Sequence, residues 1–218
     1  MLLYAITSRN LLPGTESQRQ AALVDLARRW ARADIAYIQI REKDLAPSVL
    51  LALAARIVTA VRAENTSTRV LVNGPSDIAL AAEADGVHLP ASTPADAASV
   101  ARQAFQSAGR EAIVSRACHT LEEIRATGEV SLLVFAPVFE KAADPGTNPT
   151  ESPAPAGIAG GTGLDVLREA CRAAAPTPVI ALGGVTASNA PACMAAGAAG
   201  VAGIRMFLSD DWRKLRSL

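Results

Sequence analysis

Aromatic residues are scarce in this chain, because Phe, Trp and Tyr together make up only 4% of its 218 residues. Half of all residues are nevertheless hydrophobic, so a core must be built mainly from Ala, Val, Leu and Ile. Such residues are typical of parallel strands buried on both faces beneath a layer of helices. The composition therefore favours an α/β protein with a parallel sheet.

Cysteine is also rare. The three residues, Cys118, Cys171 and Cys193, are an odd number and are scattered without the spacing of metal ligands. This pattern argues against a disulfide framework and against a zinc site. We expect reduced thiols, as in a cytoplasmic protein.

Long apolar runs are missing as well. No segment approaches the ~18 uninterrupted apolar residues of a membrane-spanning helix. The apolar run at residues 1–7 is short and carries no cationic flank, unlike a secretory signal. We therefore expect no membrane association and a cytoplasmic location.

Neither sign of charge is in excess, since 21 Lys and Arg residues balance 21 Asp and Glu residues. Such a chain has no overall field to attract nucleic acid or an anionic membrane. The expected partner is a small molecule, and the sequence leaves open whether the chain forms a homo-oligomer.

Short apolar runs alternate with longer amphipathic ones from end to end. The expected strands are 2–8, 35–42, 69–73, 86–89, 112–119, 131–139, 178–183 and 200–207. The expected helices lie near 16–33, 47–64, 75–84, 94–107, 120–127, 162–174, 186–196 and 209–217. About eight βα units in a chain of this length predict a single-domain TIM (β/α)8 barrel over residues 1–218. The alternative is an open doubly wound sheet, but the G-x-G-x-x-G turn that would favour it is absent after the first strand.

The segment 140–163 interrupts this rhythm, because from residue 144 onward it is crowded with Pro, Gly, Ser and Thr. A loop of this length in a compact domain is usually either a lid over a site or a disordered insertion. Both interpretations remain open.

The active sites of such barrels lie at the carboxyl ends of the strands. Along the second strand, period-two alternation places Gln39, Arg41 and Lys43 on one face. Polar groups that point into a barrel mouth are costly to bury without a polar partner, and a phosphate suits a guanidinium well. A structural ion pair of Arg41 with a neighbouring carboxylate is the alternative.

The last two units carry a pattern suited to binding an anion. Gly183 and Gly184 end the seventh strand, and residues 200–205, including Ile204 and Arg205, form the eighth. Glycines let backbone N–H groups approach an anion, and a following helix can supply further donors. The two glycines could instead serve only a tight turn.

Two histidines differ in their settings. His119 ends the fifth strand, directly before a capping-box sequence at 120–123, where it could exchange protons near neutral pH. His88 lies between apolar residues within the fourth strand and is better interpreted as a core histidine. Asn73, at the end of the third strand, is a candidate for orienting a polar ligand.

These stretches resemble the thiamine phosphate synthase and TenI family. The matching segments are 39–43 (QIREK), 72–74 with 77–80, 84–89 (ADGVHL), 119–123 (HTLEE), 137–139 (PVF), 181–184 (ALGG) and 197–202, in the family's order over nearly the whole chain. The resemblance implies a barrel whose last two strand exits grip the phosphate of a hydroxyethyl-thiazole phosphate. It also implies that Gln39, Arg41, Lys43 and Asn73 line the pocket for the partner group.

The synthase branch of this family joins an aminopyrimidine diphosphate to the thiazole phosphate with the help of Mg²⁺. Its members usually have an Asn-Asp pair after the third strand, an Asp beyond the fourth, and Thr-x-Thr-Lys after the sixth. Here the first two positions read Asn73-Gly74 and Thr93. The third, segment 140–144, lacks the paired threonines. Since Mg²⁺ needs carboxylate oxygens beside substrate phosphates, these departures argue against the synthase reaction.

The TenI-like branch matches better, and its best-described activity is a thiazole tautomerase that moves a ring proton without a metal. By this resemblance His119 is the proton shuttle, while Gly183, Gly184, Ile204 and Arg205 form the anion cup. We expect no cofactor, and Mg²⁺ only if the alternative, a thiamine-phosphate synthase with an altered metal site, holds. A further alternative is a non-catalytic regulator that binds thiazole phosphate.

Overall fold

Eight parallel strands close into a barrel in which each strand pairs with its neighbours in sequence and β1 pairs with β8. The computed structural model describes residues 1–64, 67–140 and 161–217. The strands are β1 (Leu2–Ile6), β2 (Tyr37–Ile40), β3 (Arg69–Val72), β4 (Gly86–Leu89), β5 (Ile113–Cys118), β6 (Leu132–Phe135), β7 (Val179–Ala181) and β8 (Gly200–Gly203). The predicted TIM barrel is confirmed, and the open sheet is wrong.

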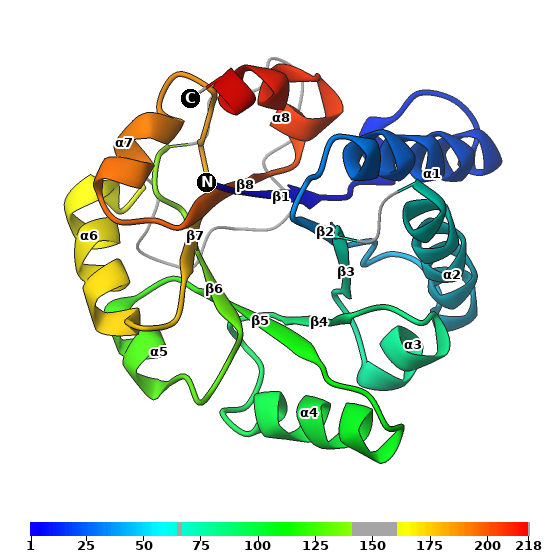
Figure 1. Ribbon diagram of the computed structural model, residues 1–218, viewed down its shortest axis with the longest axis horizontal. Helices are drawn as coiled ribbons and strands as arrows, with labels where there is room; N and C mark the ends of the chain where they lie inside the picture. Colours follow the sequence, from blue (N-terminus) through cyan, green and yellow to red (C-terminus); the bar gives the residue numbers. More distant parts are fainter. Residues whose placement is uncertain (65–66, 141–160, 218) are drawn as a thin grey trace.

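Helices cover the outside of this barrel in a ring (Figure 1). They are α1 (Glu16–Arg32), α2 (Pro47–Glu64), α3 (Ser76–Ala81), α4 (Ala97–Ser107), α5 (Leu121–Ala126), α6 (Gly163–Ala174), α7 (Ala190–Ala195) and α8 (Arg205–Leu208), with 3₁₀ helices η1 (Arg9–Leu11) and η2 (Asp211–Ser217). Among the described residues, no helix has the length and apolar character needed to cross a bilayer.

Period-two alternation sorts the strand side chains between two hydrophobic clusters. Ile38 and Ile40 of β2 belong to the larger cluster between the sheet and the helices. Tyr37 packs instead against the smaller cluster inside the barrel, which contains Tyr4 and Leu71. The predicted division of β2 into an inner and an outer face is therefore confirmed.

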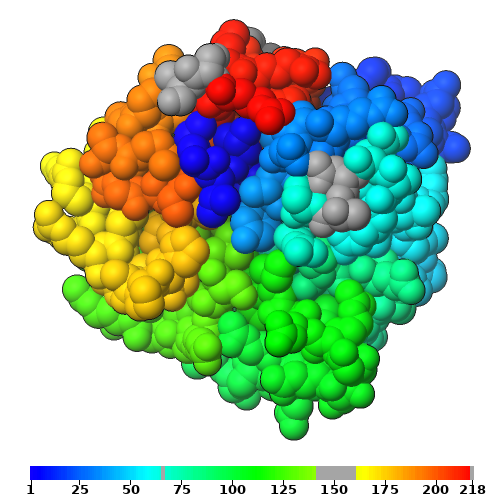
Figure 2. Space-filling view, viewed as in Figure 1, coloured from blue at the N-terminus to red at the C-terminus, as the bar shows by residue number. Residues whose placement is uncertain are grey.

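The two ends of the chain meet on one side of the molecule. Phe207 of α8 is fully buried and stacks on Trp212 of η2, with an interplanar angle of 11°. It meets Trp30 of α1 edge-on, and the Trp30 indole N–H donates to the Phe207 carbonyl oxygen at 3.2 Å. Figure 2 shows the same closure, because the red C-terminal atoms lie directly beside the blue N-terminal ones.

Several boundaries differ from the sequence-based expectation, mostly at the carboxyl ends of strands. The eighth strand was expected to run to residue 207, but it ends at Gly203, and Arg205–Leu208 is helical. The sixth ends at Phe135 rather than 139, because Pro137 has no N–H for a strand ladder. Of the expected lid at 140–163, residues 141–160 lie outside the described part of the chain.

Candidate active site at the carboxyl ends of the strands

A cavity of about 660 Å³ opens where β7 and β8 end. Its lining includes the four predicted cup residues, Gly183, Gly184, Ile204 and Arg205. Asp211 and Lys214 of η2 extend it outward and form an ion pair of 2.7 Å. The structure therefore brings the predicted cup together at one place, with two cationic side chains in its wall.

Gly183 and Gly184 both adopt left-handed backbone conformations, with φ of 93° and 61°. A Cβ atom on Gly184 would lie 2.5 Å from the carbonyl oxygen of Glu140, and one on Gly183 would lie 2.7 Å from the Cα of Pro137. The glycines thus let the β7 exit pack against the segment after β6. Both glycines lie in a bend after β7, and both also line the cavity.

The helix expected at 186–196 is shorter than predicted, since α7 covers only Ala190–Ala195. Residues 186–189 form a turn in which the Thr186 N–H donates to Asn189 Oδ1 at 2.7 Å. Neither α7 nor the four-residue α8 is long enough to supply a substantial helix dipole. The case for the cup therefore rests on its glycine backbone and its cations.

The exit of β2 supplies polar groups from a second direction. Gln39 is buried on the inner face, and its Oε1 has no hydrogen-bond partner among the described residues. Burying an amide oxygen that accepts no hydrogen bond costs free energy. Gln39 Oε1 can therefore accept a hydrogen bond from a ligand. Burial, and then the charge of Arg41, lower the pKa of Lys43.

The carboxylate beside Arg41 in sequence has another partner. Glu42 is 3% exposed and accepts hydrogen bonds from Thr7 Oγ1 at 2.6 Å and from Arg9 Nη1 at 3.0 Å. Arg9 was not singled out in the sequence, although it is itself buried and follows β1 as Glu42 follows β2. Because β1 and β2 are parallel neighbours, the residues just beyond their ends could have been paired from the predicted strand order.

His88 points into the barrel, where it belongs to a buried polar group. Its Nδ1 lies 2.7 Å from Ser115 Oγ, which in turn lies 3.1 Å from the hydroxyl of Tyr4. Burial, and then the charges of Arg41 and Lys43, lower the pKa of His88 to about 3. The interpretation as a core histidine is confirmed, and the imidazole is neutral at physiological pH.

His119 follows β5 and is partly buried. Its Nδ1 lies 2.7 Å from the carbonyl oxygen of Ala136 at the end of β6. Because a carbonyl oxygen can only accept, Nδ1 carries a proton, and in the neutral imidazole Nε2 is the acceptor. Its backbone N–H donates to Glu123, whose own N–H donates to Thr120 Oγ1 at 3.1 Å, so the predicted capping box forms only in part, with the N–H of His119 in place of that of Thr120. His119 lines neither of the two cavities described at this end of the barrel.

A second cavity, of about 470 Å³, lies where β3 and β4 end. Asn73, Gly74, His88 and Thr93 are among its lining residues. Asn73 and His88 therefore share the wall of one cavity. The predicted site residues are thus distributed around one mouth but fall into separate groups.

The residues here do not fit a magnesium ion. Thr93 donates its hydroxyl to the Pro90 carbonyl oxygen at 2.6 Å, and its own carbonyl accepts from the guanidinium of Arg116 at 2.6 Å. The same buried guanidinium also donates to the Pro94 carbonyl at 3.1 Å. A fixed cation on this loop opposes a divalent cation beside it, and the one carboxylate in the cavity wall, that of Asp96, is exposed.

Comparisons with known proteins give a consistent family. A family model described as thiamine monophosphate synthase (TMP-TENI) matches residues 3–207. A putative thiamine-phosphate synthase 2 of Aquifex aeolicus is 30% identical over 208 residues, which cover 94% of this chain and 97% of that protein. The thiamine-phosphate synthase of Methanocella arvoryzae is 33% identical over 211 residues, covering 96% and 88%.

Among solved structures, a thiamine phosphate pyrophosphorylase from Pyrococcus furiosus matches with a TM-score of 0.74 and 24% identity, covering 99% of this chain and 94% of that one. At this identity the match supports the fold alone. The names of the relatives favour the synthase alternative over the tautomerase, for which none of them is named. Because the family model spans nearly the whole chain, this protein belongs to the thiamine monophosphate synthase (TMP-TENI) family.

Proposed function

We propose that this protein is an enzyme of thiamine biosynthesis that binds a thiazole phosphate at the carboxyl end of its barrel. The cavity at the ends of β7 and β8 carries this proposal, because it combines left-handed glycine backbone with the cations Arg205 and Lys214. Left-handed glycine backbone can direct its N–H groups toward a phosphate, and the nearby cations attract it.

We propose further that its reaction is the tautomerisation of the thiazole ring. The observation that favours this reaction is the hydrogen bond of His119 Nδ1 to Ala136 O, because it selects the tautomer in which the neutral ring presents Nε2 as a base. In this reaction Nε2 removes a proton from one ring atom, and the resulting imidazolium returns a proton to another. No electrons leave or enter the substrate, so the step needs one acid/base group and no second reactant.

The residues around Asn73 support the same choice. A departing diphosphate needs compensation for its charge, and Mg²⁺ held by carboxylates is the usual provider in the synthases that this chain resembles. Gly74 and Thr93 offer no carboxylate, and the hydroxyl of Thr93 is already engaged with Pro90. The tautomerase reaction releases no such group.

A second candidate reaction is thiamine-phosphate synthesis, which the names of the relatives favour. In that case the anionic diphosphate would have to be met by Arg41, Lys43 and Asn73. A regulator that binds thiazole phosphate without turnover is the remaining alternative.

One set of assays separates these candidates. The purified protein is incubated with the less stable carboxythiazole phosphate tautomer in EDTA, and separately with both synthase substrates and Mg²⁺. We expect ring aromatisation, followed by NMR, in the first mixture and no thiamine phosphate in the second. Metal-dependent thiamine phosphate formation would replace the tautomerase with the synthase, and tight binding without either product would favour the regulator.

A further inference from the structure

The short segment that follows β2 presents its side chains alternately to two sides. Arg41 and Lys43 alternate with Glu42 and Asp44 and so lie on the side of the segment away from Arg9, and the charges of both also lower the pKa of His88. Glu42 and Asp44 lie toward the residues that follow β1, where both contact Arg9. One side of the segment is therefore cationic, and the other is anionic and occupied.

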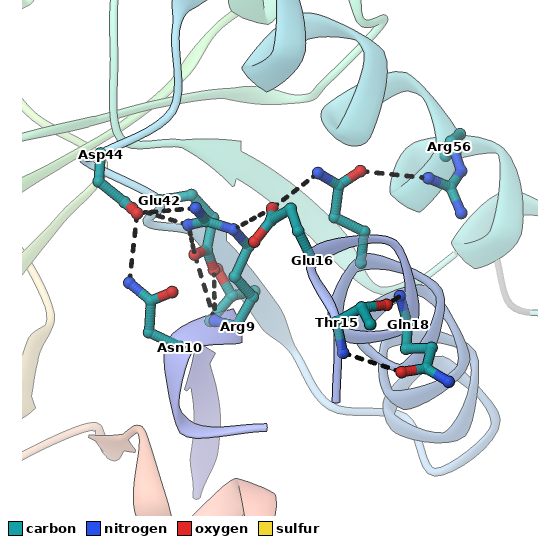
Figure 3. Close-up of polar contacts among 10 residues, drawn as sticks. Arg9, Asn10, Thr15, Glu16, Gln18, Glu42, Asp44 and Arg56 are labelled. Carbon is teal, nitrogen blue, oxygen red and sulfur yellow. Dashed lines mark hydrogen bonds and ion pairs between the residues drawn. The ribbon is translucent and has the colours of Figure 1, made fainter. Parts of the chain in front are cut away.

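Arg9 binds three carboxylates from two different elements (Figure 3). Its guanidinium forms a bidentate pair with Asp44, with both Nη1–Oδ1 and Nη2–Oδ2 at 2.7 Å. Nη1 also donates to Glu42 Oε2 at 3.0 Å, and Nε donates to Glu16 Oε1 at 2.7 Å. The Arg9 side chain is 5% exposed and that of Glu42 is 2% exposed, so their contact is shielded from water, whereas Glu16 and Asp44 are about half exposed.

Three hydrogen bonds join the end of β2 and the segment after it to the residues that follow β1. The Thr7 N–H donates to the Gln39 carbonyl oxygen at 2.9 Å, and the Arg41 N–H donates to Thr7 Oγ1 at 2.9 Å. The Arg9 N–H donates to Glu42 Oε1 at 3.1 Å. Glu42 and Asp44 are thus held by hydrogen bonds, and the cations Arg41 and Lys43 alternate with them along the segment.

We propose that Arg9 is a positioning residue that, through Glu42 and Asp44, holds Arg41 and Lys43 side by side as a preformed receptor for an anionic group of the ligand. Two like charges repel, so a flexible segment would separate them and leave each in water. The carboxylates on the opposite side of the segment offset that repulsion, and the bidentate contact with Asp44 fixes the segment's direction. The ligand then meets both cations without first having to order them.

This inference rests on the proposed function in one respect: the ligand must have an anionic group, a carboxylate or a phosphate, that binds at the end of β2. It can be tested without turnover, by measuring the affinity of the protein for inorganic diphosphate by calorimetry. Absence of catalysis in the wild-type protein would therefore count against the proposed function and not against the role of Arg9.

The experiment compares four proteins in a double-mutant cycle: the wild type, Arg9→Met, Arg41→Met/Lys43→Met, and the triple variant. We expect Arg9→Met to weaken diphosphate binding about tenfold, and to weaken it less than about twofold when Arg41 and Lys43 are already absent. Arg9→Lys, which keeps the charge but loses the bidentate geometry, should recover only part of the affinity. A purely structural or purely electrostatic role predicts equal losses in both backgrounds, and that result would overturn the proposal.

Two further variants keep the test decisive if Arg9→Met fails to fold. Asp44→Asn breaks the bidentate pair at an exposed carboxylate, so it should fold normally and still weaken binding about threefold or more. Arg32→Met is the matched control, because Arg32 forms a comparable bidentate pair with Glu64, at 2.7 and 2.8 Å, between α1 and α2. Diphosphate affinity unchanged in Asp44→Asn, or reduced equally in Arg32→Met, would contradict the assignment.

Discussion

His119 and His88 show how the surroundings of one residue type lead to two different roles. His119 has one nitrogen fixed on a backbone carbonyl and the other available, which suits proton transfer. His88 has its Nδ1 beside Ser115 in a buried group, where desolvation keeps the ring neutral. The position of His88 within a strand and that of His119 at the end of one were enough to predict different roles for them from the sequence.

Replacing His119 with Ala should lower the tautomerisation rate by about 10²- to 10⁴-fold, which is the usual contribution of a positioned acid/base. Thiazole phosphate affinity, measured by calorimetry, should stay within about twofold of the wild type, because no phosphate contact is removed. His119→Asn is the matched control, since an amide can still donate to Ala136 but cannot exchange a proton. Wild-type activity in either variant would remove the assigned role.

His88 should make the protein less stable in acid. Its pKa is lowered to about 3 in the folded chain, against 6.5 for an ordinary histidine. As the pH falls below about 6.5 the unfolded chain takes up a proton that the folded chain does not, so the free energy of unfolding falls by up to about 1.4 kcal/mol per pH unit. Urea unfolding at pH 7.5 and pH 5 should show a smaller pH effect in His88→Gln, and an identical effect would contradict this account.

Arg9 was the main omission at the level of residues. Its sequence context gives no sign of burial, and its role depends on Glu42, which lies 33 positions away in the sequence. The neighbouring candidates Gln39, Arg41 and Lys43 could be proposed because they share one strand. A contact between the ends of two strands depends on the strand order as well.

At the scale of elements, the exits of the strands carry both the site and most of the differences from expectation. Strand interiors were predictable from apolar runs, because burial between two layers dictates their composition. Strand ends were not, since β6 and β8 stop where the chain turns toward the cavity. The pattern of hydrophobic residues continues past this point, through Val138 and Phe207, because these residues remain buried after the strand has ended.

Gly184→Ala tests the close approach between the β7 exit and the segment after β6. The new Cβ would meet the Glu140 carbonyl oxygen at 2.5 Å in a left-handed backbone, so we expect a loss of about 2–3 kcal/mol in the free energy of unfolding and weaker thiazole phosphate binding. Gly163→Ala is the matched control, because Gly163 is also left-handed but a Cβ atom added to it would have no described atom within 4 Å. Equal losses in the two variants would show that backbone conformation alone matters.

For the whole molecule, closure of the barrel brings the first and last βα units together and so completes the site. The register of β1 with β8 and the aromatic cluster of Trp30, Phe207 and Trp212 make this connection. The count of βα units predicted the closed barrel, because parallel strands need helical crossovers. The cluster itself was not foreseen, since Trp30 lies far from Phe207 and Trp212 in the sequence.

Phe207→Ala should remove about 3–5 kcal/mol from the free energy of unfolding, because a fully buried ring between two indoles leaves a cavity. The chain has only two tryptophans, and both flank this ring, so their fluorescence reports on this contact. Their emission should shift to longer wavelength in the folded variant. A loss below about 1 kcal/mol with unchanged emission would mean that the two ends are joined mainly by the strand ladder.

A crystal structure with bound thiazole phosphate tests most directly the claim that the ligand is held at this mouth. The account predicts the phosphate in the cavity at the ends of β7 and β8, within hydrogen-bond distance of the Gly183–Gly184 backbone, with the ring directed toward His119 Nε2. A phosphate bound instead beside Asn73 and Thr93, or a ring beyond the reach of His119, would contradict it.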